Sequence, residues 1–90
     1  MSSIIVKRGG VDQKFDERKV YASVFASLVA VSTPTKEAEL VATEITKIIN
    51  RWLAEKSHVT SHEIRVQVAH ELKDYNHLAS YIYDKHRILS

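Results

Sequence analysis

The spacing of apolar residues after residue 15 is the feature that most constrains how this 90-residue chain folds. Apolar side chains recur every three or four residues in successive segments, which is the period of a helix with one buried face. The segments are separated by Ser32-Thr33-Pro34-Thr35, by Thr60-Ser61-His62-Glu63, which has the pattern of a capping box, and by Asp74-Tyr75-Asn76. The pattern predicts four helices with these core-facing residues: Val20, Val24, Phe25, Leu28 and Val29; Ala38, Val41, Ile45, Ile48, Ile49, Trp52 and Leu53; Ile64, Val68 and Leu72; Leu78, Ala79 and Ile82.

The first 15 residues have a different pattern, typical of two short strands. The segments 4–8 and 11–15 flank Gly9-Gly10, a pair that suits a two-residue hairpin turn. This turn would place Lys7 opposite Asp12. An isolated hairpin is marginally stable in water, so we expect it to pack on the helices. The sequence thus predicts an α+β fold in which residues 1–90 form a single domain, with an N-terminal β-hairpin capping a four-helix bundle.

Composition excludes several classes of function. The chain has no cysteine, which excludes disulfides, cysteine-containing zinc sites and thiol catalysis. Its apolar runs are too short to span a bilayer, and its N-terminus lacks the pattern of a cleavable signal, so we expect a cytoplasmic protein without membrane contacts. No Ser-His-Asp arrangement or paired carboxylates can be argued from the spacing, and no further ligand completes a metal site around His58 and His62. We therefore expect no enzymatic activity and no protein metal site.

Positive charge is concentrated near the N-terminus, although the formal net charge is just +2. Asp16 is expected to cap the first helix, and the cations Arg18 and Lys19 then fall in its first turn, where the helix dipole disfavours positive charge. A bound anion would reverse that penalty. The hairpin brings further cations close to this turn, and together they predict a pocket for a polyphosphate. The cations of this region are Lys7, Arg8, Lys14, Arg18 and Lys19.

Three other interpretations are compatible with the same residues. Lys7 could pair with Asp12 across the hairpin, and such surface pairs contribute about 0–1 kcal/mol. The basic hairpin could belong to a nucleic-acid-binding module, although the low net charge does not favour nucleic acid as the partner. The chain could also be a ligand-free helical domain for protein interaction, with Trp52 and the tyrosines at 75, 81 and 83 as its contact surface.

Several motifs resemble the ATP-cone family. Val6-Lys7-Arg8-Gly9-Gly10 and Phe15-Asp16-Glu17-Arg18-Lys19-Val20 resemble the two N-terminal motifs of that family. The segment 59–64 is similar to the family's start of the third helix, and residues 74–79 are similar to the stretch before its last helix. The resemblance covers nearly the whole chain in the same order. It implies a regulatory domain that binds ATP or dATP and controls ribonucleotide reductase through nucleotide-dependent assembly.

The resemblance also implies roles for individual residues. Lys7 and Arg8 would contact phosphates, and Lys19 would add a cation from the helix start. Gln13 stands where glutamate is common, and Arg65 stands where some members have an acidic residue or histidine near the base. The full set implied to bind nucleotide is Lys7, Arg8, Gln13, Asp16, Lys19, Val20, Thr60, Ser61, Arg65 and Arg87, with Val20 lining the base or sugar and Ser61, or its neighbour Thr60, offering a hydroxyl group.

The implied ligand is ATP or dATP with Mg²⁺, acting as an allosteric effector. The implied partner is a catalytic or radical subunit of a reductase, which is either part of the same chain or a separate protein. The resemblance also implies that the domain could form a homo-oligomer when nucleotide is bound. Repressors of reductase genes that contain this domain also carry a cysteine-rich zinc ribbon, which the present chain lacks.

Overall fold

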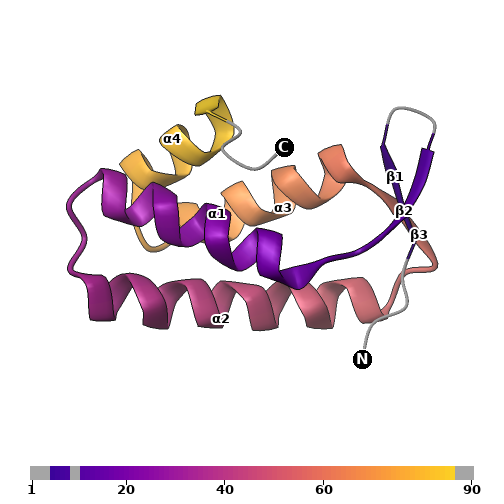
Figure 1. Cartoon of the computed structure of the whole chain (residues 1–90), viewed down its shortest axis with the longest axis horizontal. Helices are drawn as coiled ribbons and strands as arrows, with labels where there is room; N and C mark the ends of the chain where they lie inside the picture. Colours follow the sequence, from indigo (N-terminus) through magenta and orange to yellow (C-terminus); the bar gives the residue numbers. More distant parts are fainter. Residues whose placement is uncertain (1–4, 9–10, 87–90) are drawn as a thin grey trace.

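Four helices and three short strands make up the computed structural model, which describes residues 5–8 and 11–86, with side chains for 14–85. The predicted turn at Gly9-Gly10 and the predicted site residue Arg87 lie outside the described residues. The helices pack side by side, and the strands gather at one end of them (Figure 1). In chain order the elements are β1 (Ile5–Arg8), β2 (Val11–Lys14), α1 (Glu17–Ala30), α2 (Thr35–Ala54), β3 (His58–Thr60), α3 (Ser61–Lys73) and α4 (His77–His86).

The predicted fold class, a β-hairpin capping a four-helix bundle, is wrong. Helices dominate the described chain, and the small β-element is a three-stranded sheet in the order β2-β1-β3. β1 and β2 are antiparallel, with Lys7 opposite Asp12, while β3 runs parallel to β1. The physical reason for the difference is that a two-stranded ribbon leaves both strand edges open. Pairing with β3 makes β1 the central strand and satisfies its second edge.

The helix boundaries follow local capping chemistry. Asp16 caps α1 by accepting a hydrogen bond from the Arg18 N–H at 3.0 Å. The predicted capping box at the start of α3 is confirmed, because the Glu63 N–H donates to Thr60 Oγ1 at 3.0 Å and the Thr60 N–H donates to Glu63 Oε1 at 2.8 Å. α1 ends in a turn in which Ser32 has a φ of 65°, in the left-handed region.

The core lies among the four helices, with α1 and α3 each packed against both α2 and α4. A hydrogen bond from Ser80 Oγ to the carbonyl oxygen of Ala69, 2.7 Å long, ties α4 to α3. In the described part of the chain, no helix combines the length and the apolar character needed to cross a membrane. The buried apolar residues are Val20, Val24, Leu28, Ala38, Ala42, Ile45, Ile49, Leu53, Val59, Ile64, Val68, Leu72 and Ala79.

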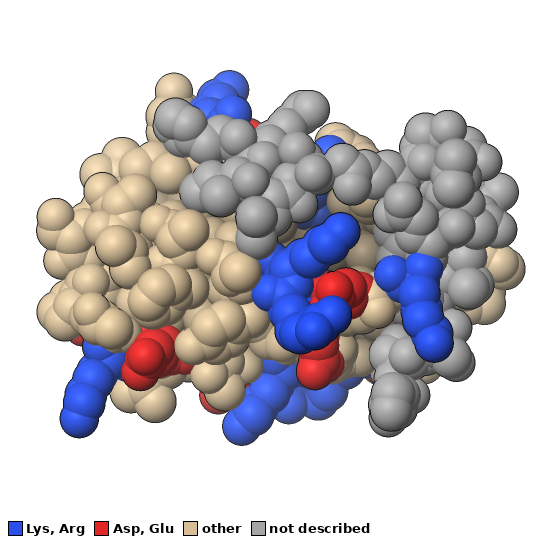
Figure 2. All heavy atoms as spheres, in the orientation of Figure 1, with Lys and Arg blue, Asp and Glu red and all other residues tan. Residues whose placement is uncertain are grey.

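Two residues predicted to face the core, Val29 and Leu78, are instead exposed, at 45% and 58% of their surface. The sequence of α1 explains the first error, because it carries no charged residue after Lys19. A helix that is apolar or small on every side gives no contrast from which to choose its buried face. In Figure 2 most of the face to the left of the start of α1 is accordingly free of Lys, Arg, Asp and Glu.

Candidate nucleotide site

The sheet brings together two predicted site segments that are far apart in the sequence. β1 and β3 are parallel neighbours, and in their register Lys7 is aligned with Thr60. Thr60 is also the N-cap of α3, so the basic strand lies beside the start of that helix. The predicted Lys-Arg strand and the predicted capping-box segment therefore meet at one end of the molecule.

The start of α1 follows β2 after two residues, on the side of the helices that carries the sheet (Figure 1). Lys14 and Lys19 are exposed there. Figure 2 shows Lys and Arg side chains grouped with Asp and Glu side chains over this part of the surface. The region thus contains both the cations that would attract a polyphosphate and carboxylates that would oppose it.

Asp16 and Arg18 pair with each other within this group. Arg18 Nε lies 3.1 Å from Asp16 Oδ1, and Arg18 Nη2 donates to Asp16 Oδ2 at 3.2 Å. The hydrogen bond from the Arg18 side chain, followed by the one from its backbone N–H, lowers the pKa of Asp16 below its ordinary value. Asp16 therefore remains ionised at neutral pH as a helix cap whose charge is partly balanced by Arg18.

The other described site residues have distinct environments. Val20 is 6% exposed and belongs to the apolar core, so its contact with a ligand would require its neighbours to move. Ser61 is half-buried as the first residue of α3, while the hydroxyl of Thr60 is engaged in the capping box. Arg65 is half-buried close enough to Tyr83 on α4 to affect its ionisation. For Lys7, Arg8 and Gln13 the structure describes the backbone, which places Lys7 and Arg8 on β1 and Gln13 on β2.

Sequence reasoning missed a hydrogen bond that fastens the start of α1 to α2. Asn50 Nδ2 donates to Glu17 Oε1 at 2.7 Å. Asn50 Oδ1 is buried and has no hydrogen-bond partner among the described residues. Nothing in the local sequence indicates this contact, because the two residues are 33 positions apart and lie on different helices.

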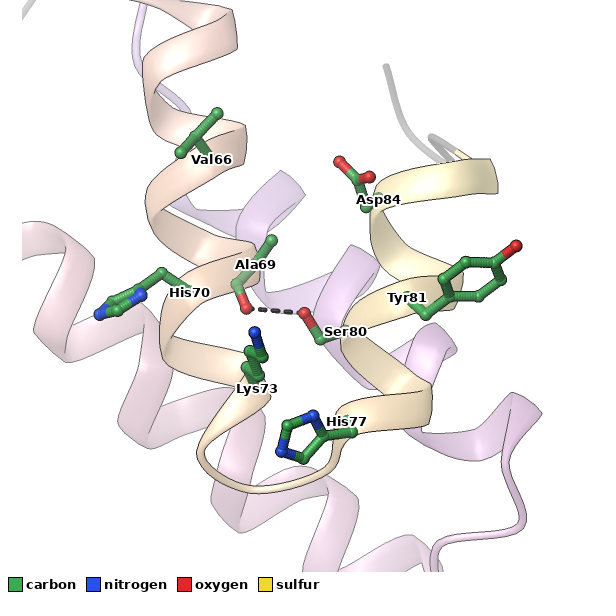
Figure 3. A pocket seen from close by; sticks show the side chains of 8 residues that line it. All are labelled: Val66, Ala69, His70, Lys73, His77, Ser80, Tyr81 and Asp84. Atoms are coloured by element: carbon green, nitrogen blue, oxygen red, sulfur yellow. Dashed lines mark hydrogen bonds between the residues drawn. The ribbon is translucent and has the colours of Figure 1, made fainter.

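A separate groove of about 480 Å³ lies between α3 and α4 (Figure 3). It contains none of the predicted nucleotide-binding residues. The ring of His70 points away from α4, and the ring of Tyr81 points away from α3, so neither closes the groove (Figure 3). No group of three His, Asp or Glu side chains suited to a metal ion occurs within the described residues. The groove is lined by Val66, Ala69, His70, Lys73, His77, Ser80, Tyr81 and Asp84.

The buried phenol of Tyr83 makes the stability of the domain depend on pH, and this dependence tests how α4 packs near Arg65. Burial raises the pKa of the Tyr83 phenol to about 12, with the charge of Arg65 opposing and that of Asp84 assisting the shift. The unfolded chain ionises first, so this contribution to stability is complete below pH 10 and is lost as pH rises towards 12. We expect wild type to lose about 2–3 kcal/mol more than Tyr83→Phe over this range.

Urea unfolding of both proteins at intervals from pH 8 to pH 12 measures this difference. Other groups titrate over the same range in both proteins, so the informative quantity is the difference between the two curves. Parallel curves would show that the phenol is not buried in solution.

A small helical domain with a basic strand beside a helix start has the features of a module that binds an anionic ligand. The family model described as ATP cone domain matches residues 3–87, and the chain belongs to this family. It is therefore a nucleotide-binding regulatory domain, one that is not itself catalytic and whose effectors are ATP and dATP. No curated protein and no solved structure matched the chain significantly.

Proposed function

We propose that this domain senses ATP and dATP and thereby controls the activity of a ribonucleotide reductase through nucleotide-dependent assembly. The observation that carries the proposal is the alignment of Lys7 with Thr60 across the β1–β3 pair. It joins a strand with two consecutive cations to the start of a helix, a combination suited to a triphosphate. The match to the family over most of the chain supports the adenine nucleotide as the ligand.

In this proposal the phosphates lie at the sheet end of the molecule, near Lys7, Arg8 and Lys19. Gln13 and Asp16 supply polar contacts, and Ser61 supplies a hydroxyl group, with Thr60 as the alternative donor if the capping box opens. Arg65 and Val20 lie towards the base and sugar. Arg87 adds a cation from the C-terminal side.

Mg²⁺ would enter with the nucleotide. The two carboxylates at the start of α1 are both engaged, Asp16 with Arg18 and Glu17 with Asn50. A magnesium ion there would therefore be held mainly by phosphate oxygens and water, which is its usual coordination in nucleotide complexes. This arrangement requires no carboxylate from the protein.

Regulation requires that ATP and dATP differ in how strongly each binds the active and the inhibited assembly of the reductase. A coupling of about 1–3 kcal/mol between nucleotide and partner binding is typical of such systems. The partner is a catalytic or radical subunit of the reductase, in cis or in trans, and a second copy of this domain is the other candidate for the contact.

Titration with ATP, dATP and GTP, by calorimetry and by NMR, tests the proposal. We expect ATP and dATP to compete for one pocket, to shift the backbone amides of Lys7, Arg8 and Lys19, and to bind more tightly than GTP. Binding to DNA or RNA that falls steeply with salt, without a response to triphosphates, would instead indicate a nucleic-acid module. No response to any of these ligands would favour a protein-interaction domain.

A further inference from the structure

Both carboxylates at the start of α1 are held by hydrogen bonds, and they are held in different ways. Asp16, the N-cap, accepts hydrogen bonds from the side chain of Arg18, two residues further along the chain. Glu17 is bound by Asn50, which reaches it from α2 at 2.7 Å. The second contact links two helices and fixes the side of α1 on which the Glu17 charge lies.

The position of Glu17 creates an electrostatic conflict. In the absence of a bound anion, a glutamate in the first turn stabilises the helix, because it complements the positive end of the helix dipole. The same negative charge repels a triphosphate that binds beside Lys19. A binding-competent domain therefore has to keep the Glu17 carboxylate away from the phosphates.

Helix geometry shows how the contact achieves this separation. Residues two apart in a helix do not face each other, so Glu17 and Lys19 project on different sides of the first turn. Asn50 holds Glu17 on the side that packs against α2. The side that carries Lys19 remains free of that carboxylate.

Asn50 itself is poorly explained by stability alone. Its Oδ1 is buried and has no partner among the described residues, a condition that generally destabilises a folded protein. A leucine of similar shape would fill the same space without an unsatisfied oxygen, and the exposed Glu17 would remain solvated.

We propose that Asn50 is a positioning residue for nucleotide affinity: it holds the Glu17 carboxylate against α2, away from the cations that receive the phosphates. The inference depends on the proposed nucleotide site at the start of α1. It adds a residue that lies outside the family motifs matched in the sequence and that acts through Glu17.

The test compares four versions of the chain by calorimetric titration with dATP: wild type, Asn50→Leu, Glu17→Gln and the double variant. Released from Asn50, Glu17 becomes free to turn towards the phosphates, so we expect Asn50→Leu to weaken dATP binding about three- to tenfold. The double variant should regain at least wild-type affinity, because the displaced side chain then carries no charge. Thr46→Val is the matched control: Thr46 lies one turn earlier on α2, is half-buried, and bonds to the Ala42 carbonyl oxygen of its own helix.

Salt separates this role from a structural one. The loss in Asn50→Leu should shrink as ionic strength rises from about 0.1 M to about 1 M, because screening shortens from about 10 Å to about 3 Å. Without nucleotide, Asn50→Leu and the double variant should have similar melting temperatures, because both have lost the hydrogen bond between Asn50 and Glu17. A loss that persists in the Glu17→Gln background and does not change with salt would overturn the inference, as would unchanged affinity in Asn50→Leu. Absence of dATP and ATP binding in wild type would instead overturn the nucleotide site itself, and this inference with it.

Discussion

Replacing Lys7 and Lys19 together with alanine is expected to weaken the binding of ATP and dATP by about 100-fold or more. Each hydrogen bond between a charged side chain and phosphate contributes about 1.5–3 kcal/mol, and each 1.4 kcal/mol is about tenfold in affinity. Lys19 is exposed and Lys7 belongs to a short strand at one end of the helices, so we expect the free energy of unfolding to change little. Calorimetric titration measures the affinity, and thermal unfolding without nucleotide measures the stability.

The control is a double variant with the same change in charge at helix ends away from the sheet, Lys36→Ala with Lys73→Ala. Both side chains are exposed, Lys36 in the first turn of α2 and Lys73 at the end of α3. If this control weakens binding as much as the Lys7 and Lys19 variant does, the effect comes from net charge and the phosphate site is misplaced. If the Lys7 and Lys19 variant unfolds in the absence of ligand, these lysines are structural.

Ile45→Ala is expected to have the largest effect on stability among the substitutions considered. Ile45 lies in the middle of α2 and is fully buried among core residues from the neighbouring helices. Removing a buried aliphatic side chain costs about 2–5 kcal/mol through lost transfer energy and the cavity that remains. Because a domain has about 5–15 kcal/mol of stability in total, the melting temperature should fall by about 10 °C or more.

Leu40→Ala on the same helix is the matched comparison. Leu40 is 72% exposed, so we expect a change within about 0.5 kcal/mol. Equal effects of the two substitutions on urea unfolding would contradict the burial of α2 described above.

Local chemistry allowed much of the helical architecture to be predicted from sequence. The Asp16 cap and the Thr60–Glu63 capping box depend on residues close together in the chain, and both form as expected. The third strand could not be predicted, because β3 has three residues and gains its stability from pairing with a distant strand. For this reason the predicted fold class was wrong.

The candidate site was predicted unevenly for similar physical reasons. The basic residues of β1 and of the first turn of α1 are visible in the sequence as a local excess of charge. The contact between Asn50 and Glu17 is not visible, because it depends on how α1 and α2 pack. Val20 was predicted to contact the ligand because it belongs to a matched motif, but its side chain lies in the core.

The junction between β3 and α3 has a mechanical consequence. The strand ends at Thr60 and the helix begins at Ser61, so no loop separates them. Thr60 both pairs with β1 and caps α3, so we expect a shift of β1 to act directly on the start of α3. The hydrogen bond from Ser80 Oγ to the Ala69 carbonyl oxygen then links α3 to the last helix.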